Sequence, residues 1–149
     1  MRQPRKITLE AQLEKMRLDW DARARENARH YVATGRTDWT DEAFFAAGEQ
    51  AVADDILTDM NNVCQGRDPK VMRVLEIGCG AGRLTRALAN LFGEVHAVDI
   101  SGEMIEHARH ALHDKPNAHV YQNNGYDLRV IPPPGVRFRI FQHRFSTYP

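Results

Sequence analysis

Three glycines at alternate positions, Gly78, Gly80 and Gly82, carry the clearest chemical signal in this chain. They follow the apolar run Val71–Ile77 and precede a stretch with helical spacing. Because glycine has no Cβ, the backbone here can turn with positive φ and a ligand can approach it closely. The free amides at the start of the helix would then face that ligand. The spacing therefore predicts a nucleotide-type binding site.

Two acids flank this glycine loop. Glu76 stands two residues before the first glycine, and Asp99 ends the second apolar run, 95–100. A carboxylate at the end of a second strand can accept both hydroxyls of a ribose. Arg83 occupies the third-glycine position of the dinucleotide fingerprint, and Glu76 would repel a phosphate. A nicotinamide-dependent oxidoreductase is therefore the disfavoured alternative.

The elements that position these residues follow from periodicity. The run 71–77 predicts a buried strand of a parallel sheet, and 95–100 predicts a second one. Between them, 83–92 repeats leucines at helical spacing and ends at Gly93, so we expect a helix. Further helices are expected over 7–31, from 40 through 60, and over 102–113, where Ser101 is the N-cap. A third strand is expected at 118–122.

The run Glu76-Ile77-Gly78-Cys79-Gly80-Ala81-Gly82 resembles motif I of the class I S-adenosylmethionine (SAM) methyltransferases. The similarity continues through Val98–Ser101 and Met104, and covers roughly 71–128. It implies an α/β, Rossmann-like fold with a parallel sheet and SAM as cofactor. It also implies that Glu76 lies near the methionine end of the cofactor and Asp99 at the ribose. The expected cofactor-binding residues are Glu76, Gly78, Cys79, Gly80, Gly82, Asp99, Ile100, Met104 and Asn124.

Asn124 has two interpretations. In the family an acid near this position meets the adenine amino group, and the carbonyl of Asn124 could accept the same hydrogen bond. Asn124-Gly125 is equally a simple turn signal. Both interpretations stay open at the level of sequence.

Other reactive side chains receive structural interpretations. Cys79 has no partner nearby in sequence, and small residues are expected in this loop, so it is not expected to be a nucleophile. His107, His110 and His113 recur at i, i+3 and i+6, which we interpret as a solvated helix face. We therefore expect no metal site, and the sequence identifies no catalytic base.

The chain divides into an N-terminal helical arm, residues 1–68, and a SAM-binding domain, 69–149. Leu9, Leu13, Met16 and Trp20 form one apolar stripe on the first helix. The favoured interpretation is a helix packed on the side of the domain, and the alternative is a lid over the substrate site or a dimer contact. For the aromatic pair at 44–45, a core role is favoured over a place beside substrate or cofactor.

After Leu128 the chain departs from the family, so we expect the fold to be truncated after the third strand and incomplete at the C-terminus. Suitable codons for 138–149, read one nucleotide later, give a sequence resembling the family's fourth strand. We expect a frameshift near the proline run 132–134, leaving 136–149 without evolved function. As written, the end alternates charged and apolar residues as an edge strand would. The open sheet edge predicts self-association.

Composition narrows the function further. The net charge of the 149 residues is +0, so no strong field attracts nucleic acid or an anionic membrane. No apolar run has membrane length and no signal peptide is recognised, so a cytoplasmic location is expected. We expect a SAM-dependent methyltransferase acting on a small molecule, this chain carrying mainly the cofactor-binding half. The alternative is a non-catalytic remnant that at most binds the cofactor, S-adenosylhomocysteine (SAH) or a protein partner.

Overall fold

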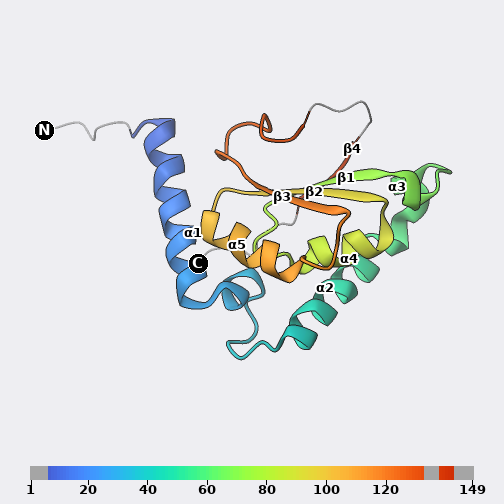
Figure 1. Cartoon of the computed structure of the whole chain (residues 1–149), viewed down its shortest axis with the longest axis horizontal. Coiled ribbons are helices and arrows are strands. Elements are labelled where there is room, and N and C mark those ends of the chain that lie inside the picture. Colours follow the sequence, from blue (N-terminus) through green and yellow to red (C-terminus); the bar gives the residue numbers. More distant parts are fainter. Residues whose placement is uncertain (1–6, 133–137, 143–149) are drawn as a thin grey trace, which may run out of the picture.

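A four-stranded parallel sheet forms the centre of the computed structural model, which describes residues 7–132 and 138–142 (Figure 1). The strand order is β3-β2-β1-β4. The strands are β1 (Arg73–Ile77), β2 (Glu94–Asp99), β3 (Ala118–Gln122) and β4 (Phe138–Gln142). Helix α4 (Arg83–Leu91) connects β1 to β2, and α5 (Gly102–Ala111) connects β2 to β3. The predicted α/β Rossmann-like class and its βαβ unit are confirmed.

The fourth strand lies at one edge of the sheet. β4 pairs in parallel with β1, from Phe138 opposite Arg73 to Gln142 opposite Ile77. The backbone of 138–142 is thus the edge strand that the alternation predicted. The recognised motifs predicted strands only as far as β3, so β4 is one strand more than they indicated. The frameshift stays a prediction, and the rest of its segment, 136–137 and 143–149, lies outside the described residues.

Two of the expected N-terminal helices are interrupted. α1 (Leu9–Val32) is kinked at Asn27, which has φ −164° and ψ 86°. The helix expected from 40 through 60 is three elements: α2 (Asp41–Asp55), a 3-10 turn η1 (Leu57–Asp59) and α3 (Met60–Cys64). Ile56, at the end of α2, and Cys64, at the end of α3, both belong to one core cluster. No helix in the described part of the chain combines the length and apolarity needed to cross a bilayer.

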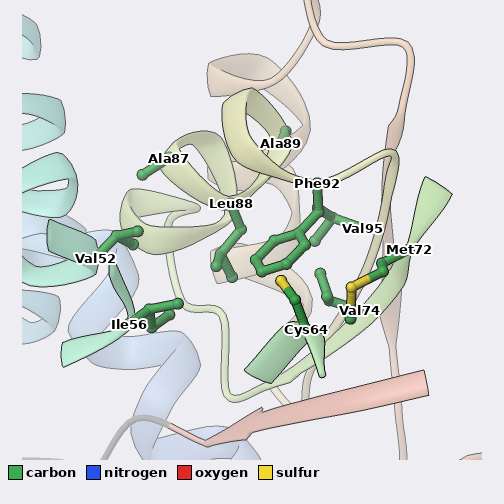
Figure 2. Packing of buried hydrophobic residues seen from close by; sticks show 10 residues of the cluster. All are labelled: Val52, Ile56, Cys64, Met72, Val74, Ala87, Leu88, Ala89, Phe92 and Val95. Carbon is green, nitrogen blue, oxygen red and sulfur yellow. The ribbon is translucent and has the colours of Figure 1, made fainter. Parts of the chain in front are cut away.

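One face of the sheet is covered by α2, α4 and α5 (Figure 1). Phe92 and Leu88 lie at the centre of the packing there, almost fully buried (Figure 2). Burying such a side chain stabilises the fold by roughly 1.5–3 kcal/mol. Gly48 lets α2 approach α4, because a Cβ there would lie 2.3 Å from the Arg83 carbonyl oxygen. The cluster comprises Val52, Ile56, Cys64, Met72, Val74, Ala87, Leu88, Ala89, Phe92 and Val95.

The opposite face carries a smaller apolar cluster and a group of charges. Leu75 and Val98 pack with Ile131, from the segment that follows β3. Nearer the amino ends of the strands, Arg73 donates to both carboxylate oxygens of Glu94, at 2.5 and 2.9 Å. These bonds, the largest cause, lower the pKa of Glu94 to about 2. The charges on this end of the sheet thus largely satisfy one another.

Candidate cofactor-binding site

The glycine loop has the predicted conformation. Gly78, Gly80 and Gly82 have φ of 78°, 53° and 86°, in the left-handed region that favours glycine. The amides of Gly78 and Cys79 donate to the carbonyl of Val98, at 2.8 and 3.0 Å, and tie the loop to β2. The loop is therefore held at the carboxyl ends of β1 and β2.

Asp99 is fixed against this loop. One carboxylate oxygen accepts the amide of Gly80 and the other accepts the amide of Ser101, each at 2.9 Å. Burial raises the pKa of Asp99, and the backbone hydrogen bonds oppose that rise. A carboxylate offers about four acceptor positions, so each oxygen can also accept a ligand hydroxyl. Asp99 thus has the placement that ribose binding requires.

Glu76 lies behind the loop on β1. Its side chain is 2% exposed, and the hydroxyl of Thr85 on α4 donates to it at 2.6 Å. Burial, the largest cause, raises the pKa of Glu76 to about 7. A cation close by would favour the ionised form and lower that pKa. Its predicted place at the ammonium end of the cofactor stays a prediction.

Two adjoining cavities lie at this edge of the sheet. The smaller, about 180 Å³, is lined by five of the predicted residues: Gly78, Gly80, Asp99, Ile100 and Met104. The larger, about 600 Å³, is lined by Ile100 and Asn124, with Tyr126 and residues of α1. Ile100 and Asn123 line both cavities. Small-molecule sites usually measure about 300–1,000 Å³, so the two together can hold a nucleoside-sized ligand.

Three predicted residues, Glu76, Cys79 and Gly82, line neither of these cavities. Cys79 packs with Ala97 and Ile105, and burial raises the pKa of its thiol well above the usual value. That environment agrees with the expectation that it is no nucleophile. A Cβ on Gly82 would lie 3.4 Å from the Cα of Ala108, so this glycine permits packing against α5. A role of Cys79 or Gly82 in binding stays a prediction.

Asn124 forms the turn that its sequence suggested. Its side-chain oxygen accepts the amides of Tyr126 and Asp127, each at 2.9 Å. The same side chain also lines the larger cavity. The turn interpretation is confirmed, and the adenine contact stays a prediction.

Helix α1 contributes more to the site than the sequence indicated. Its apolar stripe lines the cavities, with Leu9 and Leu13 at the larger one and Met16 and Trp20 at the smaller. Farther along, Ala24 and Ala28 pack in a cluster with Phe44 and Met104. The side-packing interpretation therefore describes the part of α1 around Ala24 and Ala28, and the lid interpretation stays a prediction. Phe44 is core, 1% exposed, as favoured.

Asp21 on α1 is a site neighbour that sequence reasoning missed. It is buried, and it accepts the Ser101 hydroxyl at 2.6 Å and the Glu103 amide at 3.3 Å. Ser101 in turn accepts the Met104 amide, as the predicted N-cap of α5. Asp21 thus connects α1 to the residues beside Asp99. The only sequence signal was an acid next to the apolar stripe, and an exposed acid would look the same.

Comparisons with known proteins agree with this geometry. Residues 74–142 match the family model described as a methyltransferase domain. The dTDP-3-amino-3,4,6-trideoxy-alpha-D-glucopyranose N,N-dimethyltransferase of Streptomyces venezuelae is 27% identical over 90 residues, 60% of this chain and 35% of that protein. A probable ribosomal RNA small subunit methyltransferase A of Methanopyrus kandleri is 39% identical over 69 residues, 46% of this chain and 24% of that protein.

Among solved structures, a similar fold occurs in phosphoethanolamine N-methyltransferase 1 of Haemonchus contortus, in complex with phosphoethanolamine and SAH. The TM-score is 0.59 at 17% identity, over 78% of this chain and 22% of that one, a likeness of fold alone. The chain spans about a third or less of the length of its curated relatives. The matched segment 74–142 includes the glycine loop and Asp99.

Proposed function

We propose that the carboxyl end of the sheet binds SAM for methyl transfer. The fold is Rossmann-like, and residues 74–142 match the methyltransferase domain of SAM-dependent enzymes. S-adenosylmethionine is the cofactor of this family. The observation that carries the proposal is Asp99, held by the Gly80 and Ser101 amides in the wall of a cavity. A buried acid beside a glycine loop can accept the hydroxyls of a ribose while the backbone of the loop lies close to the ligand.

The side chains present fit the parts of this cofactor. Asp99 would accept the ribose hydroxyls, and Gly78 and Gly80 would allow close approach of the backbone. Ile100 and Met104 would give apolar contact near the adenine, and Glu76 behind the loop would balance the ammonium. The bound cofactor supplies a sulfonium methyl group that passes to a nucleophilic nitrogen, oxygen or carbon. The chain's contribution is to hold the reacting groups in line.

The acceptor class is a finer part of the proposal. A net charge of +0 supports a small-molecule acceptor over nucleic acid. The Streptomyces relative, named for a nucleotide sugar, agrees with a small molecule. The Methanopyrus relative, named for ribosomal RNA, makes RNA the competing acceptor.

Binding without transfer is the second candidate. Among the described residues, Asp99 is the one acid or base that lines the smaller cavity, and it is engaged with backbone amides. A base for the acceptor is therefore not evident at this wall.

The test is titration calorimetry of the full chain with SAH, and with NAD as control. We expect SAH to bind and NAD to give no heat, because Arg83 and Glu76 disfavour a pyrophosphate. Transfer from radiolabelled SAM to small amines and alcohols, with RNA in parallel, then separates the acceptor classes. SAH binding without transfer to any acceptor supports the second candidate, and absence of SAH binding contradicts the proposal.

The frameshift near 132–134 is a separate proposal about the gene. Resequencing this region and translating it in all three frames tests it. An open frame that continues through the shifted fourth strand into further strand and helix patterns supports it. A continuation in the printed frame contradicts it.

A further inference from the structure

Three potential metal ligands meet on the sheet face that α2, α4 and α5 do not cover. Glu94 and His96 are two residues apart on β2, so their side chains leave the strand on the same face. His119 is the register partner of His96 on the neighbouring strand β3. Sheet register alone therefore brings the three side chains together, although His119 lies far along the chain.

The donor atoms of these three residues converge. The Nε2 atoms of His96 and His119 lie 2.7 and 3.6 Å from the same oxygen of Glu94. One ligand atom from each residue lies within 4.8 Å of the others. Over residues 7–132 and the backbone of 138–142, no second group of three such ligands comes so close.

Neighbouring side chains orient these ligands. Arg73 donates to both oxygens of Glu94 and fixes the plane of the carboxylate. The hydroxyl of Tyr121 lies 3.1 Å from Nδ1 of His96, the ring atom opposite the converging Nε2. Metal-binding histidines and carboxylates are usually held by such outer partners, which set the tautomer and the ring orientation.

Access differs among the three ligands. The His96 side chain is 3% exposed, Glu94 30% and His119 40%. An ion can therefore approach from the His119 side, while His96 forms the floor of the cluster. This arrangement leaves one direction open to water.

We propose that Glu94, His96 and His119 form a divalent metal site of the zinc class, with water in a fourth position. Two imidazoles and one carboxylate are a ligand set that zinc accepts with an open position. The site lies toward the amino ends of the strands, away from the glycine loop and Asp99 at the carboxyl ends. Its effect is to join β3 to β2, and it is independent of the proposed methyl transfer.

The histidines on α5 provide a matched control. His107 and His110 are exposed on α5, His113 is exposed just beyond its end, and the ring centroids of His110 and His113 lie 6.2 Å apart. The sequence drew attention to that series because it is local. The cluster proposed here is assembled from two strands, so only the Glu94-x-His96 spacing was visible.

The experiment is a titration of the metal-free, untagged full chain with Co²⁺, followed by the visible absorption of a tetrahedral site, and competition with Zn²⁺. We expect one Co²⁺ per chain, displaced by Zn²⁺. His119→Ala is expected to weaken binding by about 100-fold, as loss of one of three ligands should exceed the roughly 10–100-fold effects of outer partners. His110→Ala is expected to leave the affinity unchanged.

Folding and binding are separated by two further measurements. Glu94→Gln keeps the shape of the side chain but should also abolish the cobalt spectrum, while circular dichroism stays that of the wild type. Zn²⁺ should raise the Tm of the wild type and of His110→Ala, but not that of His119→Ala. The proposal is overturned if no 1:1 binding occurs, if His119→Ala binds as well as the wild type, or if His110→Ala loses the ion.

Discussion

Two glutamates on adjacent strands of one sheet show opposite electrostatic behaviour. Glu76 on β1 is buried behind the glycine loop, and its pKa rises to about 7. Glu94 on β2 lies at the other end of the sheet beside Arg73, and its pKa falls to about 2. The difference has two causes: burial raises the pKa of Glu76, and the Arg73 guanidinium lowers the pKa of Glu94.

The two ends of the sheet therefore differ in how their acidic side chains are stabilised. At the carboxyl end, Glu76 and Asp99 accept hydrogen bonds from neutral donors, the Thr85 hydroxyl and backbone amides, so the proposed cofactor would stabilise them further. At the amino end, the charges compensate one another within the fold. The proposed cofactor site thus contains acids whose charge the protein itself leaves only partly balanced.

The largest expected effect tests whether a packing change at the amino end of the sheet leaves cofactor binding at the carboxyl end intact. A Cβ at Gly93 would lie 2.1 Å from the Lys70 carbonyl oxygen, and backbone cannot move aside as a side chain can. Gly93→Ala should lower the free energy of unfolding by about 3 kcal/mol, measured by urea denaturation. Gly35→Ala, with nothing within 4 Å, is the control and should cost far less. A lower SAH affinity in folded Gly93→Ala would show that the two ends of the sheet are not independent.

The next effect concerns the pH dependence of Glu76. Its folded pKa of about 7 lies above the unfolded value of 4.5, so its contribution to stability is fully present below pH 4.5 and is lost as pH rises toward 7. Glu76→Gln removes this loss. The unfolding free energy of the variant relative to wild type should rise by up to about 3 kcal/mol from pH 4.5 to 8. Parallel pH profiles of the two proteins would show that burial does not shift this group.

A somewhat smaller effect is expected at Asp99. Asp99→Asn keeps the size of the side chain but replaces one oxygen by a donor and removes the charge. Since a hydrogen bond to a charged group contributes about 1.5–3 kcal/mol, SAH affinity should fall by roughly 10–100-fold. Calorimetry measures this, with Asp127→Asn, a half-buried acid nearby, as control. Equal losses in both variants would contradict a specific role of Asp99.

The smallest effect is expected from the Arg73–Glu94 pair. Its side chains are 25% and 30% exposed, so solvent screening limits its contribution to about 1 kcal/mol. The folded pKa of Glu94 lies below 4.5, so this contribution is full above pH 4.5 and is lost as pH falls toward 2. Arg73→Gln should therefore be about 1 kcal/mol less stable at pH 6, and the gap should close in acid. A gap that persists at pH 2 would point to packing instead of charge.

The sequence predicted the βαβ unit because its signals are local. The strand 118–122 was predicted to the residue, and the helix 83–92 ended one residue early, since apolar spacing and Gly93 mark those elements. Gly78, Gly80, Asp99, Ile100 and Met104 meet at one cavity, as expected from the carboxyl ends of parallel strands.

What the sequence could not predict depends on contacts between distant segments. The helix expected through Met60 ends at Asp55, and Ile56 after it packs with residues of the distant helix α4 and strands β1 and β2. The tie from Asp21 to Ser101, and the meeting of His96 with His119, depend on how α1 and β3 are placed. Burial likewise decides that Glu76 and Glu94 differ, and sequence does not show burial of a single acid.

The position of β4 has a consequence for the order of folding. Val74 pairs with Val95, 21 residues on, but also with Arg139, 65 residues on. Closing the longer loop costs about 1 kcal/mol more in chain entropy. At synthesis rates of about 5–20 residues per second, the twenty residues from Gln122 to Gln142 take about 1–4 seconds to add. β1, β2 and β3 can therefore associate on the ribosome first, and β4 joins a sheet whose central strands are already paired.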